Sequence, residues 1–154
     1  MIRALAHTDA EACDAVVRTL PYHFGHEGGQ AECARAVRTQ DGFVAVEEGE
    51  VVGFLTLLRH DPRSAEVTWM AVRADRRRRG IGRRLIELAV DDLARDGVKL
   101  LSLLTVAESE PEERESDNYA DTRAFYDALG FVPLRELALE SWDERAVMLV
   151  RRVP

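Results

Sequence analysis

The sequence contains little cysteine and no long apolar segment. Only Cys13 and Cys33 occur among its 154 residues, and neither lies in a CxxC or CxxH spacing. We interpret both as reduced structural thiols rather than metal ligands, and we expect no metal site. No stretch approaches the roughly 18 apolar residues of a membrane span, and the N-terminus has no apolar core of signal-peptide length. These absences predict a cytoplasmic protein that does not associate with membranes.

The chain also has an excess of acidic over basic residues. Its formal net charge is -7 and its isoelectric point is about 5.2, which argues against bulk attraction to nucleic acid. Hydrophobic residues make up 46% of the chain, enough to bury one core without disulfides or metal. There is no internal repeat, low-complexity tract or Pro/Ser-rich linker, so we expect one domain over residues 1–154.

The hydrophobic pattern predicts an α/β fold with the element order αα-βββ-α-β-α-ββ. Thr8 and Glu11 form a capping-box signature at the start of the first helix. A helix connects the strand at 65–72 to the strand at 98–106, so these two strands should run parallel. The expected segments are 8–19 and 29–39 (helices), 43–47, 51–59 and 65–72 (strands), 82–97 (helix), 98–106 (strand), 119–130 (helix), and 131–139 and 145–152 (strands).

One strongly basic segment contrasts with the acidic composition. RRRRGIGRR, residues 76–84, joins a predicted strand to a predicted helix. Free backbone N–H groups and the positive end of the helix dipole favour an anion at such a place, and glycine lets it approach the backbone. A solvated turn and a nucleic-acid contact are the alternatives. We expect N–H groups from about Arg78 to Gly82 to bind a diphosphate, with the arginines in support.

Two stretches carry a resemblance to a known family. VTWMAVRADRRRRGIGRRLIELAVDDLARDG resembles the acetyl-CoA-binding region of the GNAT superfamily of N-acetyltransferases, whose loop pattern Gln/Arg-x-x-Gly-x-Gly/Ala is matched by Arg77, Gly80 and Gly82. TRAFYDALGF resembles a later helix of that family. The resemblance implies a mixed central sheet splayed at the cofactor cleft, helices on both faces, and acetyl-CoA in the gap. The cofactor-binding residues that it implies in the loop are Arg77, Arg78, Arg79, Gly80, Ile81, Gly82 and Arg83.

The same resemblance implies direct acetyl transfer to an amine, which must first lose a proton. Near pH 7 only one lysine-type amine in roughly 2,500 is neutral. Glu66 matches the position of the family's glutamate base, although an exposed strand-start glutamate is the alternative. A backbone N–H near Ala71 or Val72 would polarise the thioester carbonyl. Tyr126 matches the family's general acid and would hydrogen-bond the developing thiolate, unless it is simply a core tyrosine.

The sequence departs from the family pattern just before that tyrosine. Relatives carry an asparagine seven residues upstream that contacts the cofactor, whereas here the position is Tyr119, with Asn118 adjacent. Either the start of the helix is shifted by one residue, so that Asn118 contacts the cofactor, or this contact is absent.

Two segments are candidates for contact with the acceptor. Residues 107–118 hold six acidic residues against Arg114, and such a rim would attract a cationic amine, although a solvated loop is the alternative. In PYHFGHEGG, His23 and His26 could line an acceptor pocket, bind a metal or pack ordinarily, and no third ligand is near in sequence.

We expect an acetyl-CoA-dependent N-acetyltransferase of primary amines. The alternative is a non-catalytic acyl-CoA-binding sensor or structural module of the same fold. Nucleic-acid binding through residues 76–84 is the third possibility, and the acidic loop and net charge speak against it. A homodimer is compatible with the resemblance.

Overall fold

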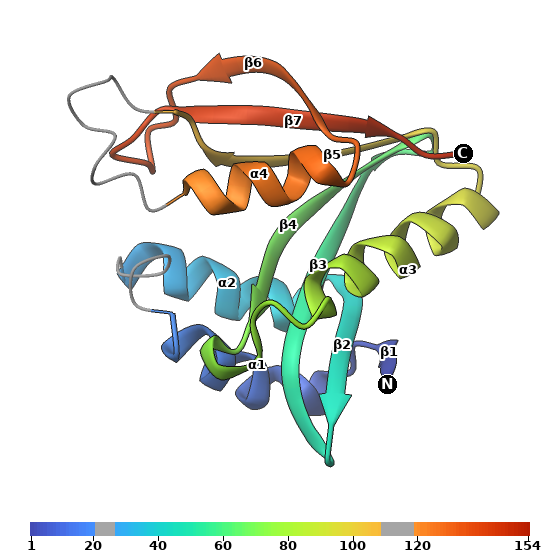
Figure 1. Ribbon diagram of the computed structural model, residues 1–154, viewed down its shortest axis with the longest axis vertical. Helices are drawn as coiled ribbons and strands as arrows, with labels where there is room; N and C mark the ends of the chain where they lie inside the picture. Colours follow the sequence, from blue (N-terminus) through green and yellow to red (C-terminus); the bar gives the residue numbers. More distant parts are fainter. Residues whose placement is uncertain (21–26, 109–118) are drawn as a thin grey trace.

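Helices cover both faces of a seven-stranded mixed sheet in the computed structural model, which describes residues 1–20, 27–108 and 119–154 (Figure 1). The helices and strands are β1 (Ile2–Ala4), α1 (Ala10–Arg18), α2 (Glu27–Thr39), β2 (Asp41–Glu47), β3 (Glu50–Asp61), β4 (Ser64–Val72), α3 (Ile81–Arg95), β5 (Leu100–Val106), α4 (Ala120–Ala128), β6 (Val132–Leu137) and β7 (Ala146–Arg152). Short 3-10 turns, η1 (His7–Asp9) and η2 (Ala74–Arg76), precede α1 and α3. The predicted order is confirmed, with one extra strand, β1, at the start.

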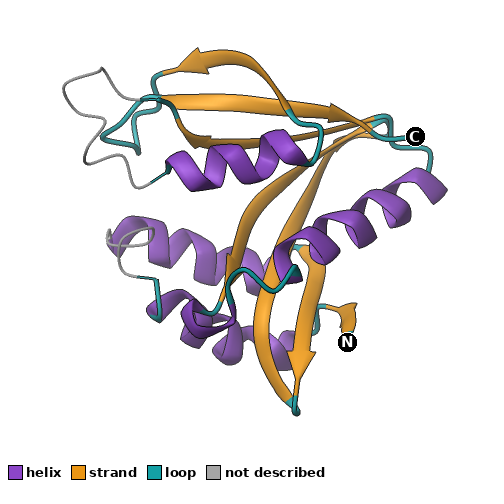
Figure 2. Cartoon of the chain, in the orientation of Figure 1, coloured by secondary structure: helices purple, strands orange, loops and turns teal. Residues whose placement is uncertain are grey.

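The sheet has the spatial order β1-β2-β3-β4-β5-β7-β6. β4 and β5 run parallel, as predicted from the helix that connects them, and every other neighbouring pair is antiparallel. The hairpin of β2 and β3 closes through a two-residue turn at Glu48 and Gly49. Figure 2 shows strands β2 to β4 forming one arm of the sheet, while β5, β7 and β6 form a second arm that crosses it at an angle.

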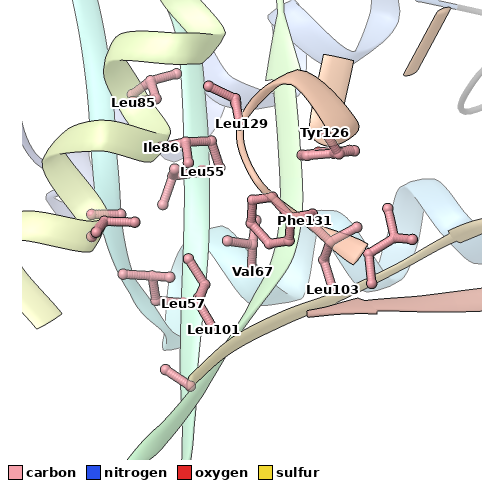
Figure 3. Close-up of a cluster of buried hydrophobic side chains, with 14 of the residues drawn as sticks. Leu55, Leu57, Val67, Leu85, Ile86, Leu101, Leu103, Tyr126, Leu129 and Phe131 are labelled. Carbon is pink, nitrogen blue, oxygen red and sulfur yellow. The ribbon is translucent and has the colours of Figure 1, made fainter. Parts of the chain in front are cut away.

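The two faces of the sheet bury separate apolar clusters. Residues of α1 and α2 pack on one face, around Phe54 of β3 and Ala71 of β4. On the other face α3 contributes apolar residues at spacings of three and four, which is why one side of that helix is wholly buried. Figure 3 shows this second cluster, in which residues of α3 and α4 meet the sheet: Leu55, Leu57, Val67, Leu85, Ile86, Leu101, Leu103, Tyr126, Leu129 and Phe131.

Both cysteines lie in the cluster beneath α1 and α2. Cys13 and Cys33 are buried, and neither is in a disulfide. Burial raises the pKa of each thiol to about 12, so both stay protonated near neutral pH. They act as small apolar residues of the core. None of the helices in the described ranges is long and apolar enough to cross a membrane.

The N-terminal segment differs from its prediction. The expected capping box of Thr8 and Glu11 is wrong, because Asp9 takes the capping role: its carboxylate accepts the N–H of Ala6 at 2.8 Å. The same carboxylate accepts two hydrogen bonds from the Arg3 guanidinium, at 2.8 and 2.9 Å. This ion pair holds the pKa of Asp9 below its usual value. The helical segment therefore begins at His7, one residue before the predicted start, and is tied to β1.

Candidate active site

A cleft opens where β4 and β5 part. The two strands pair only from Ser64↔Leu100 to Val67↔Leu103, although β4 continues to Val72 and β5 to Val106. Beyond Val67 their facing edges line a cleft of about 1390 Å³, together with the start of α3 and one side of α4. Figure 1 shows the divergence as the angle between β4 and β5. The splayed sheet expected from the resemblance is confirmed.

A β-bulge at Thr68 accompanies this divergence. Against β3, Val67 pairs with Leu57 and Trp69 pairs with Thr56, so Thr68 is an extra residue in β4. Its hydroxyl donates to the side-chain oxygen of Gln40 at 2.5 Å and accepts from the Thr56 hydroxyl at 2.7 Å. A bulge bends the strand that carries it, and these hydrogen bonds hold the bend in place. The end of β4 is thereby directed away from β5.

The strand register decides which backbone groups face the cleft. The N–H of Arg73 donates to the carbonyl of Val52 at 2.7 Å, and hydrogen-bonded pairs alternate along an antiparallel ladder. The N–H of Ala71 is therefore directed toward β3. The N–H groups of Met70 and Val72 point the other way, to the side from which β5 has departed. Of the two residues predicted to polarise a carbonyl, Val72 is oriented to do so and Ala71 is not.

The loop between β4 and α3 also presents backbone N–H groups at the cleft. Gly80 is the N-cap of α3, with φ of 77°, and no side chain caps the helix. The first helical bond is donated by the N–H of Arg84 to the carbonyl of Gly80, at 3.0 Å. The preceding N–H groups, of Ile81, Gly82 and Arg83, have no intrahelical acceptor. The N–H groups without an intrahelical acceptor thus extend one residue beyond the expected range, which ended at Gly82.

The two glycines of the loop are needed for different reasons. Gly80 is needed for its left-handed φ, which residues with a side chain rarely adopt. Lack of space is not the reason, because a β-carbon there would meet nothing within 4 Å. Gly82 has ordinary helical geometry but lacks space, because a β-carbon would lie 3.2 Å from the Phe125 ring of α4 and 3.7 Å from Met70. Gly82 therefore keeps the start of α3 close to α4 across the cleft.

The arginines of the loop divide into two groups. The Arg76 guanidinium forms ion pairs within the protein, 3.1 Å from the carboxylate of Glu47 and 2.8 Å from that of Asp75. In contrast, the side chains of three others are exposed and form no ion pair with any described residue: Arg77, Arg78 and Arg79. Arg78 also has a positive φ of 64°. These three remain available to an anion, whereas Arg76 anchors the loop to β2.

Most of the residues predicted to contact the cofactor line the cleft. Those that line the cleft are Ala71, Val72, Arg77, Arg78, Gly80, Ile81, Gly82 and Arg83. Arg79 is not among the lining residues, and Arg83 is 2.9 Å from Glu87 on the same helix. Asn118, His23 and His26 lie outside the described residues. Within those residues no cluster of three or more His, Cys, Asp or Glu side chains is suited to a metal ion.

Glu66 and Tyr126 both line the cleft. Glu66 lies on β4 just before the bulge, and its side chain is 22% exposed. Tyr126 is 6% exposed and packs edge-on against Phe125 and Phe131, with ring centroids 5.1 and 5.5 Å away. Its hydroxyl has no hydrogen-bond partner among the described residues. Burial raises the pKa of Tyr126 well above its usual value, so the hydroxyl remains a donor.

Acidic and aromatic side chains from other segments also line the cleft. Glu32 of α2, Asp121 of α4 and Glu144 of the β6–β7 connection are among them, and none forms an ion pair with a described residue. Trp142 and Tyr119 line the cleft too, and burial together with the nearby Glu144 raises the pKa of Tyr119. Figure 1 shows the starts of α2 and α4 and the β6–β7 connection on the same side of the molecule. Sequence reasoning missed these carboxylates because they come from distant segments.

Comparisons with known proteins agree with this geometry. Residues 38–133 match the acetyltransferase (GNAT) domain family. A putative acetyltransferase of the GNAT family from Desulfovibrio desulfuricans is 20% identical, with 100% of this chain and 99% of that chain covered and a TM-score of 0.83. No curated protein sequence is significantly similar to this chain.

Two further solved structures share the fold at low identity. An aminoglycoside 6'-N-acetyltransferase complexed with coenzyme A is 19% identical, with 100% of this chain and 97% of that chain covered and a TM-score of 0.75. The ribosomal-protein-S18-alanine N-acetyltransferase from Escherichia coli is 23% identical, with 99% of this chain and 93% of that chain covered and a TM-score of 0.75. At these identities the likeness establishes the fold.

The geometry predicts that the turn matters more than the internal arginine for binding CoA. Gly82→Leu should weaken CoA binding about tenfold or more, because the new side chain displaces Phe125 into the cleft. Arg76→Ala removes only a partly exposed ion pair and should change the Kd by less than about threefold. Isothermal titration calorimetry measures both, with melting temperatures as the control for folding. The reverse ranking would mean that the arginines, and not the turn, bind the phosphates.

Proposed function

The chain belongs to the GNAT family of acetyltransferases, and we propose that it moves an acetyl group from acetyl-CoA directly to a primary amine. One observation carries the proposal: a single cleft combines outward-facing N–H groups of β4, the start of α3, the Glu66 carboxylate and the Tyr126 hydroxyl. Each of these supplies something that acyl transfer from a thioester requires. The proposal is for one domain acting in the cytoplasm, which suits two unpaired, buried cysteines.

The residues of the cleft fit CoA. The free N–H groups of Ile81, Gly82 and Arg83 and the positive end of the α3 dipole suit a diphosphate, and the first turn of α3 contains no acidic residue to repel it. Arg77 and Arg78 add charged donors. The open edge of β4 offers N–H groups to an extended chain of amides, which would take the place of β5.

Glu66 accepts the proton that the amine must lose. A lysine-type amine is almost wholly protonated near pH 7, and an ammonium group has no lone pair with which to attack a carbonyl. Glu66 reaches the cleft from the strand that also presents the polarising N–H groups, so base and electrophile share one rigid element. The proton passes to the carboxylate directly or through one water molecule.

The thioester carbonyl is polarised by the backbone of β4. The N–H groups of Met70 and Val72 face the gap and are fixed by the ladder with β3. Fixed dipoles of this kind stabilise the negative charge that develops on the carbonyl oxygen without burying a side-chain charge. Two donors are available for this role. They are the N–H of Met70 and that of Val72, which lies two residues closer than Met70 to the α3 loop.

Tyr126 stabilises the departing thiolate. Its hydroxyl is buried, lines the cleft and has no partner among the described residues, so it is free to donate to sulfur. Because burial raises the pKa of Tyr126, complete transfer of its proton to a thiolate is unfavourable. Tyr126 therefore donates a hydrogen bond while the thiolate forms, and the sulfur acquires its proton from solvent afterwards.

The acceptor in this proposal is an amine with a further positive charge. Glu32, Asp121 and Glu144 line the cleft and are not neutralised by any described side chain. Trp142 and Tyr119 beside them offer aromatic faces to a cation. One amino group of such an acceptor reacts, and the second remains charged and is held by the carboxylates.

The roles of Glu66 and Tyr126 predict separable losses of activity. Glu66→Gln should lower kcat about 100-fold or more, the usual effect of removing a general base. Tyr126→Phe keeps the ring packing and should lower kcat about tenfold, since one hydrogen bond to a developing charge is lost. Binding of acetyl-CoA should be retained in both variants.

These losses are measured as CoA thiol released with a panel of amines, and Glu136→Gln, a carboxylate outside the cleft, is the matched control. A wild-type chain that gains thermal stability from acetyl-CoA but releases no thiol with any amine would contradict the proposal. It would favour the non-catalytic acyl-CoA-binding alternative.

These carboxylates of the cleft predict a selective effect on KM. The triple variant Glu32→Gln, Asp121→Asn, Glu144→Gln should raise the KM for 1,4-diaminobutane about tenfold at low salt, because the attraction to the second ammonium is lost. The KM for acetyl-CoA should stay unchanged, and the difference should shrink as salt is added.

The matched control neutralises three carboxylates outside the cleft, Asp91, Asp92 and Glu136. Equal changes of KM in the two triple variants would show that net charge, and not the carboxylates that line the cleft, attracts the acceptor.

A further inference from the structure

His60 contacts the side chain of the proposed base from the neighbouring strand. Its Nε2 lies 2.7 Å from Oε1 of Glu66. The two side chains differ in their surroundings. Glu66 lines the cleft, whereas His60 is not among the described residues that line it, and 49% of the His60 side chain is exposed. The contact therefore joins the wall of the cleft to the surface of the molecule.

A second irregularity in the β3–β4 ladder produces this contact. Arg59 pairs with Ala65 and Asp61 pairs with Ser64, so His60 is an extra residue in β3. A bulge redirects the side chain of the extra residue, and here it brings the imidazole to the carboxylate. Glu66 thus lies between two bulges, one at His60 on β3 and one at Thr68 on its own strand.

The charged neighbours of His60 on β3 interact elsewhere. The Arg59 guanidinium lies 2.7 Å from the carboxylate of Asp96 at the end of α3. The carboxylate of Asp61 accepts the N–H of Arg63 at 2.8 Å. His60 and Glu66 consequently form a pair of their own, and no other ion pair of Glu66 occurs within the described part of the chain.

We propose that His60 is a positioning residue for the reaction, and this inference rests on the proposed function, in which Glu66 accepts the proton of the amine. An ionised carboxylate can only accept hydrogen bonds, so the imidazole N–H donates to Oε1. The bond restricts a side chain with three rotatable bonds and leaves Oε2 free for the amine or for the water between them. His60 itself does not touch the acceptor or acetyl-CoA.

Four variants test this role: His60→Ala, His60→Gln, Arg59→Ala, and His60→Ala combined with Glu66→Gln. His60→Ala should lower kcat about tenfold, the factor expected when a hydrogen bond to a charged group is lost. The KM for acetyl-CoA should stay within about twofold, because His60 lies outside the cleft. His60→Gln keeps an N–H donor and should recover most of the rate.

The double variant separates positioning from a general effect on structure. On top of Glu66→Gln, His60→Ala should change the residual rate by less than about twofold, since the group that His60 orients is already gone. Arg59→Ala removes only an exposed ion pair and should leave kcat unchanged. Melting temperatures within about 3 °C of wild type establish that the variants are folded. If His60→Ala fails to fold, the kcat of His60→Gln relative to wild type tests the role of His60 instead.

Unchanged kcat in His60→Ala would overturn the inference, and so would a tenfold loss that persists in the Glu66→Gln background. A rate in His60→Gln as low as in His60→Ala would overturn it too. Each of these outcomes leaves the proposed function intact, because the wild-type chain still acetylates amines. Failure of the proposed function is distinct: wild type binds acetyl-CoA and releases no thiol.

Discussion

The divergence of β4 from β5 after Val67 is the constraint on which the whole site depends. Paired strands satisfy each other's backbone N–H and carbonyl groups, so a sheet that opens must find other partners for them. The bulge at Thr68, fixed by Thr56 and Gln40, makes the opening a permanent part of the structure. The N–H groups of Met70 and Val72 then face a cleft instead of a strand. A ligand with an extended row of amides and a thioester carbonyl is chemically matched to that edge.

The cleft is lined by side chains of both charges, and this accounts for an arginine-rich loop in an acidic chain. At the α3 end the backbone of the helix start supplies the donors, Arg76 fastens the loop through Glu47, and three exposed arginines surround it. Carboxylates of three separate segments and two aromatic rings line the same cleft. A diphosphate and an ammonium group would each meet the opposite charge. The sheet between them carries the groups proposed for chemistry, which a rigid element positions better than a loop.

Local patterns were sufficient to predict the elements, and Glu66, Tyr126 and the loop, taken as candidates from the family resemblance, all line the cleft. Features set by contacts distant in sequence could not be predicted. β1 is only three residues long and exists because β2 pairs with it. At the first helical segment it is Asp9, and not Thr8, that binds the free N–H of Ala6, and the same carboxylate is paired with Arg3. The direction of the Ala71 N–H and the contact of His60 with Glu66 both follow from the β3–β4 register, which two bulges shift and no local pattern reveals.

A crystal structure of the chain with acetyl-CoA bound is the most direct measurement. It should show the diphosphate oxygens about 2.7–3.2 Å from N–H groups of Ile81, Gly82 or Arg83. The thioester should lie between β4 and β5, with its carbonyl oxygen at the N–H of Met70 or Val72 and its sulfur beside the Tyr126 hydroxyl. Acetyl-CoA bound with its thioester outside this gap, or with phosphates held by arginine side chains alone, would contradict the dependence of the site on the splayed sheet.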